Sequence, residues 1–226
     1  MLTNKLLLNV PIFSNLDDNQ ISFILSKMTK KNYSKSEIIL MEDEVGDTFF
    51  IILEGSVKVT RDSEDGREVI LAVLSSGNFF GEISLLDGKT RSANAIAVEK
   101  TSLMILKRND FLQLIKEIPQ ISISLLSELA KRIRKTDEQV ENLAFSDAEK
   151  RIGISILSIS EQLGVIKNGL VKIPKLPFHQ DIANMAGTSR ETVSRMLKLL
   201  ETKKLIKRNS HELSFVDYNK FKSYFL

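Results

Sequence analysis

Arg91 stands out in the segment FFGEISLLDGKTRSANAI, residues 79–96, because it opens a run that otherwise reads as a half-buried strand. A phosphodiester anion would suit its fixed guanidinium fork together with the hydroxyl of Ser92. Gly81 lets the backbone approach such an anion closely, and the short turn that follows can aim N–H groups at it. Glu82 can accept from a ribose hydroxyl, or it can pair with Arg91 and merely close a core. The candidate residues of this anion site are Gly81, Glu82, Ile83, Ser84, Arg91 and Ser92.

The segment TSRETVSRMLK, residues 188–198, carries a second candidate set. On a helix its polar residues cluster toward one face and the first turn, opposite an apolar face. In the major groove of DNA, arginine pairs with guanine and glutamate accepts from cytosine. Arg190, Glu191 and Arg195 could therefore read a short G/C-containing half-site, and Lys198 suits a phosphate. The apolar face is formed by Val193, Met196, Leu197 and Leu200.

A local explanation of the same residues stays open. Thr188 as N-cap with Glu191 three residues later makes a capping box, and the arginines could simply face solvent. We nevertheless assign the wider segment to a predicted DNA-binding surface, because basic residues surround it and give affinity without reading sequence. The further residues of this predicted surface are His179, Gln180, Thr188, Ser189 and Thr192, with Lys203, Lys204, Lys207 and Arg208 as sequence-blind contacts.

The elements that must position this second set are two short helices. Apolar residues at 182, 183 and 185 predict the first, Gly187 ends it, and the second is expected from about Ser189 to Thr202. Two helices joined by a tight glycine turn make a helix-turn-helix. The sequence NGLVKIPKLPF before them predicts a turn and a short strand, and LIKRNSHELSFVDYNKF after them predicts a hairpin, the wing of such a unit.

The elements that must position Arg91 are strands. Between about 37 and 108, short apolar or alternating runs are separated by turn signals. Asp65-Gly66 between two of these runs is a strong hairpin signal. Many short strands at this spacing predict a barrel-like or sandwich-like β domain.

A helical pattern follows from about 109 to 145 and connects the two regions. Apolar residues recur along it at alternating steps of three and four, with charged neighbours, which is a heptad seam. We expect the helix to pair with its copy in a second chain, although packing on its own domain could give the same stripe. The seam is Leu126, Leu129, Ile133, Thr136, Val140 and Leu143.

Composition narrows the classes of function. The 226 residues carry a net charge of +3, but residues 1–146 hold 18 basic against 21 acidic residues and residues 147–226 hold 14 against 8. A basic C-terminal third is typical of a nucleic-acid-binding domain.

With no cysteine and two histidines, thiolate zinc sites, iron–sulfur clusters and cysteine nucleophiles are excluded, and we expect no metal, haem or enzymatic activity. No apolar stretch reaches membrane-spanning length and the start does not resemble a signal peptide, so we expect a cytoplasmic protein without membrane contacts.

The whole chain resembles the cAMP receptor protein and fumarate–nitrate regulator superfamily, and its cAMP receptor members most closely. The resemblance rests on FFGEISLLDGKTRSA, AKRIRKTDEQVENLAFSDAEKRI and SRETVSRMLKLLE, in that order. It implies an α+β protein with a cyclic-nucleotide-binding β-roll (1–118), a dimerisation helix and hinge (119–146) and a winged helix-turn-helix (147–226). It also implies a homodimer that binds palindromic TGTGA-like DNA and contacts RNA polymerase.

The resemblance assigns the ligand site residue by residue. Gly81, Glu82, Arg91 and Ser92 match the phosphate-binding cassette of the family, which favours an anion site over a structural Glu–Arg pair. Thr136 matches the threonine that meets adenine, but Asp137 stands where the family has a serine. The implied effector is cAMP. The alternatives are a pocket tuned to cGMP or a cyclic dinucleotide, a pocket without a ligand, and, with little support, an enzyme or its regulatory subunit.

Overall fold

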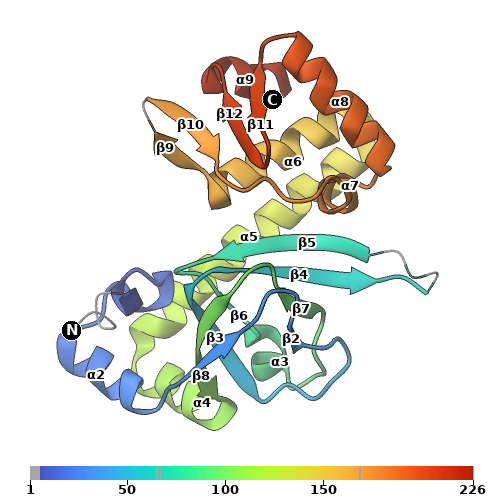
Figure 1. Cartoon of the computed structure of the whole chain (residues 1–226). Coiled ribbons are helices and arrows are strands. Elements are labelled where there is room, and N and C mark those ends of the chain that lie inside the picture. The colour runs from blue at the N-terminus through green and yellow to red at the C-terminus, as the bar shows by residue number, and fades with distance from the viewer. Residues whose placement is uncertain (1–5, 65, 67, 168, 226) are drawn as a thin grey trace. The chain divides into compact units, whose positions relative to one another are not determined.

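The structure, a computed structural model, describes residues 6–64, 66, 68–167 and 169–225. These residues form two compact units, one from residues up to 61 and residues 72–136, the other from residues 62–71 and 137 onward. Strands and helices are both abundant in each unit (Figure 1), which confirms the predicted α+β class.

Two antiparallel sheets build the N-terminal half, with strand orders β1-β8-β3-β6 and β2-β7-β4-β5 (Figure 1). Strands β4 and β5 are neighbours in the second sheet, which is consistent with the predicted hairpin. Asp65 of the hairpin turn lies outside the described residues. The strands are β1 (Thr29–Tyr33), β2 (Ile38–Leu40), β3 (Thr48–Glu54), β4 (Ser56–Asp62), β5 (Glu68–Ser75), β6 (Phe79–Phe80), β7 (Asn94–Ala97) and β8 (Thr101–Lys107).

Strand β3 is buried on both faces, which explains its unbroken apolar run TFFIILE. Because side chains alternate across a strand, Phe49 and Ile51 join one apolar cluster, whereas Phe50 and Ile52 join another. The first cluster packs the sheet against helices, and the second contains residues of both sheets. Because both faces of β3 are packed, this strand holds its first residue, Thr48, in a fixed position.

Helices cover the first of these clusters. They are the 3-10 turn η1 (Pro11–Phe13), α2 (Asp18–Ser26), α4 (Arg108–Glu117) and the start of α5 (Pro119–Phe145). The helical pattern predicted as one element is thus two helices. Ile118 between them is non-helical, with φ −123° and ψ 87°, since a residue before proline disfavours the helical conformation, and Pro119 starts the next helix.

Helix α5 is buried only near its start, at Ile121 and Leu125. The predicted seam residues Leu126, Ile133 and Val140 are 66%, 62% and 61% exposed. Packing on the helix's own domain therefore does not account for these seam residues.

The second unit has its own core around a winged helix-turn-helix. Its sheet has the order β11-β12-β10-β9, and β11 and β12 form the predicted wing hairpin. A terminal helix, which the sequence reasoning did not anticipate, buries Phe221 and Phe225. The elements are α6 (Ala148–Leu163), β9 (Val165–Lys167), β10 (Leu170–Ile173), α7 (His179–Ala186), α8 (Arg190–Thr202), β11 (Ile206–Asn209), β12 (Glu212–Phe215) and α9 (Tyr218–Phe225).

Arg151 of α6 ties the turn before α8 to the start of α6. Its guanidinium donates to the carbonyl oxygens of Ser146 (2.6 Å), Ala186 (2.8 Å) and Gly187 (3.2 Å). Gly187 ends α7 with φ 58°, in the left-handed region that favours glycine. Arg151 thereby supplies donors to carbonyl groups that the end of α7 leaves without helical partners.

None of the helices in the described ranges has the length and apolar character needed to cross a membrane.

Candidate functional site

Gly81 places a short helix against Arg91. It adopts φ 83° and ψ 6° and precedes α3 (Glu82–Asp87). A Cβ at this position would lie 3.0 Å from both Arg91 Nη1 and the Thr48 carbonyl oxygen. The glycine is therefore required both for its backbone conformation and for the close approach of the arginine.

Arg91 is buried, with 4% of its surface exposed, and its guanidinium is fully oriented by the fold. Nη1 donates to the Gly81 carbonyl and to Ser84 Oγ, both at 2.8 Å, and Nη2 donates to the Thr48 carbonyl (2.8 Å) and Thr48 Oγ1 (2.9 Å). Burial lowers the pKa of Arg91, while the carboxylates of Asp47 and Glu82 oppose this shift. A permanent cation is thus fixed beside the first turn of α3.

Glu82 is paired with a residue that the sequence reasoning did not assign to the site. Arg132 of α5 donates from Nη1 to Glu82 Oε1 at 2.8 Å and from Nη2 to the Phe79 carbonyl at 2.6 Å, and its guanidinium lies 4.4 Å from the Phe79 ring centroid. Among the described residues the carboxylate of Glu82 thus pairs with Arg132, not with Arg91 as the structural alternative supposed. Glu82 is 1% exposed, so its carboxylate is removed from water, whereas the Arg132 side chain keeps 35% of its surface exposed.

Gly46 was also missed by the sequence reasoning. A Cβ there would lie 2.1 Å from Ser84 Oγ and 3.0 Å from Arg91 Cζ, so only glycine lets this loop close over the arginine. The loop is held by the Arg91 backbone, whose N–H donates to the Glu44 carbonyl at 2.8 Å. The signal in the sequence was a glycine within a run of acidic residues, which by itself reads only as a turn.

The other predicted ligand residues differ in how they relate to the arginine. Ile83 and Ser92 have exposed side chains, and Ser84 contributes its hydroxyl as an acceptor for Arg91. Thr136 is exposed and donates to the Arg132 carbonyl at 3.0 Å, one helical turn away. Thr136 is the last residue of the first unit and Asp137 belongs to the second. The structure therefore brings together Gly81, Glu82, Ser84 and Arg91, and adds Arg132 and Thr48.

The two faces of α8 are as predicted. Val193, Met196, Leu197 and Leu200 are buried, whereas the predicted DNA-facing residues Arg190, Glu191, Arg195 and Lys198 are exposed. With Thr188 as its N-cap, the helix would begin at residue 189, but it begins one residue later, at Arg190. Ser189, not Thr188, is the N-cap, and its Oγ accepts from the Thr192 N–H at 3.2 Å.

Glu191 lies in the first turn of α8, where its charge is favoured. A hydrogen bond from its own backbone N–H and one from Ser189 lower the pKa of Glu191, and the charges of Arg190 and Arg195 lower it further. These local hydrogen bonds of Glu191 are compatible with the predicted contact to a DNA base, because the side chain of Glu191 remains exposed.

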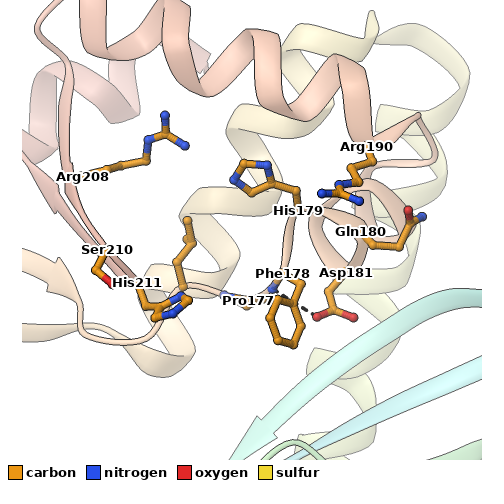
Figure 2. A pocket seen from close by; sticks show the side chains of 10 residues that line it. Pro177, Phe178, His179, Gln180, Asp181, Arg190, Arg208, Ser210 and His211 are labelled. Carbon is orange, nitrogen blue, oxygen red and sulfur yellow. Dashed lines mark hydrogen bonds between the residues drawn. The ribbon is translucent and has the colours of Figure 1, made fainter.

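His179 and Gln180 begin α7, and His179 faces α8. His179 Nδ1 lies 2.8 Å from Ser194 Oγ, and Gln180 donates to Asn184. A pocket of about 530 Å³ opens beside His179, between α7, the start of α8 and the wing (Figure 2). Arg208 of the wing lines it and also donates to Glu201 Oε2 at 2.6 Å.

Comparisons with known proteins identify both domains of the chain. Residues 30–118 match the family model for a cyclic nucleotide-binding domain, and residues 151–224 match the Crp-like helix-turn-helix domain. The cyclic AMP receptor protein of Thermus thermophilus is 35% identical over 190 residues, covering 84% of this chain and 85% of that protein. The cAMP-activated global transcriptional regulator CRP of Pasteurella multocida is 35% identical over 205 residues, covering 89% and 95%.

A solved structure shares the architecture. FixK2 from Bradyrhizobium japonicum superposes with a TM-score of 0.79 at 24% identity, covering 87% of this chain and 96% of that one. The chain therefore belongs to the CRP/FNR superfamily of transcription regulators, with a cyclic nucleotide-binding domain and a DNA-binding helix-turn-helix domain.

Proposed function

We propose that this regulator is a homodimer that binds cAMP at Arg91 and, when it does so, binds palindromic TGTGA-like DNA through α8. The observation that carries the proposal is the buried guanidinium of Arg91 beside the first turn of α3, with the carboxylate of Glu82 next to it. The anion and the ribose of a cyclic nucleotide need these two groups. Gly81, Ile83, Ser84 and Ser92 complete the proposed cassette, and the division into domains at 118 and 146 is part of the proposal.

The coupling between the two sites would pass through α5. Arg132 and Thr136 lie one turn apart on this helix, and Arg132 already binds Glu82. A nucleotide that contacts Glu82 and Thr136 would act on the helix directly, and through it on the winged helix-turn-helix. Such coupling is reciprocal, so DNA should tighten nucleotide binding by the same factor.

A second effector is favoured by one residue. Asp137, exposed on α5, stands where the resemblance places a serine, and a carboxylate can accept from the N–H groups of guanine. The alternative is therefore the same DNA-binding regulator with a pocket for cGMP or a cyclic dinucleotide, or one that binds DNA without a ligand. We also propose RNA polymerase as a partner, a cytoplasmic location, and no enzymatic activity.

The test is DNA-binding affinity for a TGTGA-type palindrome at fixed salt, measured by fluorescence anisotropy. We expect a large gain with cAMP and little change with cGMP or a cyclic dinucleotide. A gain only with another nucleotide supports the alternative effector. Tight binding that no nucleotide changes would overturn the sensor proposal and leave the DNA-binding proposal in place.

The base-reading role of Arg195 predicts a loss of specificity. Because a bidentate contact to guanine contributes about 1–3 kcal/mol, Arg195→Ala should weaken specific binding by about tenfold to a hundredfold and relax one base position. Lys198→Ala is the matched control, since a lost phosphate contact weakens all sequences about equally and reduces the salt dependence. Selection of binding sites from a random library measures both effects, and an unchanged site preference in Arg195→Ala contradicts the assignment.

The dimer proposal rests on the exposed seam of α5. Ile133→Glu should convert the dimer to a monomer in sedimentation experiments, because a carboxylate at a helix pair's apolar seam would be buried without a partner. Ile166→Glu, at an exposed isoleucine outside the seam, is the control and should leave the mass unchanged. A wild-type protein that sediments as a monomer at micromolar concentration would contradict the proposal.

A further inference from the structure

The pocket beside His179 concentrates positive charge. Arg190 and Arg208 give it two permanent positive charges, and both histidines of the chain, His179 and His211, line it together with Asp181. In Figure 2 His179 lies between Arg208 and Arg190, and His211 lies on the wing side below Arg208. Such a pocket suits an anion, because two arginines and two imidazoles offer N–H donors around one space.

The negative groups near the pocket already have partners. The Asp181 carboxylate accepts from the Phe178 N–H at 3.2 Å, across the start of α7. Glu201 is bound to Arg208, so the charge of that arginine is partly compensated. His179 itself is held by the hydroxyl of Ser194, which lies 2.8 Å from Nδ1.

The protonation of His179 depends on the charged groups around it. Partial burial lowers the pKa of His179, and the positive charges of Arg208 and Arg190 lower it further. The ring is therefore mainly neutral near pH 7 in the free protein. Since Ser194 occupies Nδ1, Nε2 is the nitrogen that remains for a ligand.

We propose that this pocket receives one backbone phosphate of duplex DNA and that His179 takes up a proton when the phosphate enters. The inference rests on the proposed DNA binding and adds a proton to it. The two arginines disfavour a third positive charge only while the pocket holds no anion. A phosphate among them reverses the balance, because the anion stabilises the imidazolium and Nε2–H can then donate to it.

The sign of the pH dependence follows. Binding takes up a proton, so DNA affinity rises as pH falls between the pKa of His179 in the complex and its lower pKa in the free protein. One proton gives at most about a tenfold change in affinity for each pH unit. The dependence disappears where His179 is neutral in both states and where it is protonated in both.

The experiment uses the full chain and a labelled duplex of mixed sequence at low ionic strength, because phosphate contacts do not read sequence. Affinity is measured from pH 5.5 to 8, about the range over which a histidine titrates. With two histidines in the chain, NMR of the imidazole C2 protons follows each one directly, and His211→Gln assigns them. We expect the pKa of His179 to rise on adding the duplex, and the wild-type affinity to rise several-fold per unit as pH falls.

Three variants make the test specific. His179→Gln should bind with little pH dependence from this pocket, and His179→Arg should bind tightly without that dependence because its charge is permanent. His211→Gln changes the other histidine that lines the pocket, at an exposed position of the wing turn, and the wild-type slope is kept if His179 is the group that takes up the proton.

Each result has a definite meaning. A wild-type slope that His179→Gln removes and His211→Gln retains supports the inference. DNA binding with no proton uptake at His179 overturns the inference and leaves the proposed function intact. Wild-type protein that binds neither this duplex nor the TGTGA-type palindrome at any pH overturns both.

Discussion

Arg91→Ala should abolish nucleotide binding and also destabilise the first unit. Removing one partner of a buried charged contact costs about 2–5 kcal/mol. The affinity for cAMP, or for whichever nucleotide the wild type binds, should therefore fall by about thirtyfold to several-thousandfold. The carbonyl groups of Thr48 and Gly81 lose their donors at the same time. We therefore expect the free energy of unfolding to fall by about 1–3 kcal/mol. Calorimetric titration and denaturant unfolding measure the two effects separately.

Two controls separate the phosphate role from the structural one. Arg91→Lys keeps the charge but loses the planar fork, so it should recover part of the nucleotide affinity and little of the stability. Arg61→Ala removes a surface arginine that pairs with Glu42 at 2.6 Å, and it should change stability by less than about 1 kcal/mol and leave nucleotide affinity unchanged. Tight nucleotide binding by a folded Arg91→Ala protein would contradict the assignment of the phosphate to this residue.

Arg132→Met should destabilise the protein more than any other single change on the exposed length of α5. It leaves the buried carboxylate of Glu82 without its cationic partner, which costs about 3–5 kcal/mol for a fully buried pair. Since the Arg132 side chain is 35% exposed, solvent reduces this to about 2–3 kcal/mol. Chemical unfolding followed by circular dichroism gives the value. Arg134→Met, two residues further along the same helix and exposed, should stay within about 0.5 kcal/mol of the wild type.

A double-mutant cycle tests whether the cost arises from this ion pair. Glu82→Gln combined with Arg132→Met should be less destabilising than the sum of the two single changes, by about 1–3 kcal/mol. Strictly additive costs would mean that Arg132 stabilises the fold through the Phe79 carbonyl and ring alone.

Local patterns in the sequence predicted the parts of the structure that depend on neighbours along the chain. The 3.6-residue period of the segment after Gly187 assigned the buried and exposed faces of α8 correctly, because one helix face must enter the core. The cap was misplaced by one residue, since Thr188 and Ser189 both carry a hydroxyl and only the backbone conformation decides between them. Ser189 has the extended conformation, φ −90° and ψ 153°, that an N-cap needs.

Partners distant in the sequence could not be predicted in this way. Nothing near Thr48 indicates that its carbonyl and hydroxyl will orient Arg91, and Arg132 resembles its charged neighbours on α5. Its position four residues before Thr136 was the one available signal, because such residues share a helix face. Helix α9 also had a usable signal. Phe221 and Phe225 are four residues apart and follow Asp217, whose carboxylate accepts from the Lys220 N–H.

The three hydrogen bonds of Arg151 have a mechanical consequence. They join the residue that follows α5 to the two residues that end α7, so one side chain links these segments although 40 positions separate Ser146 from Ala186. A displacement of residue 146 would therefore reach the turn before α8 through Arg151, without passing through the length of α6 and the sheet. A single guanidinium thus connects the end of α5 to the turn that precedes α8.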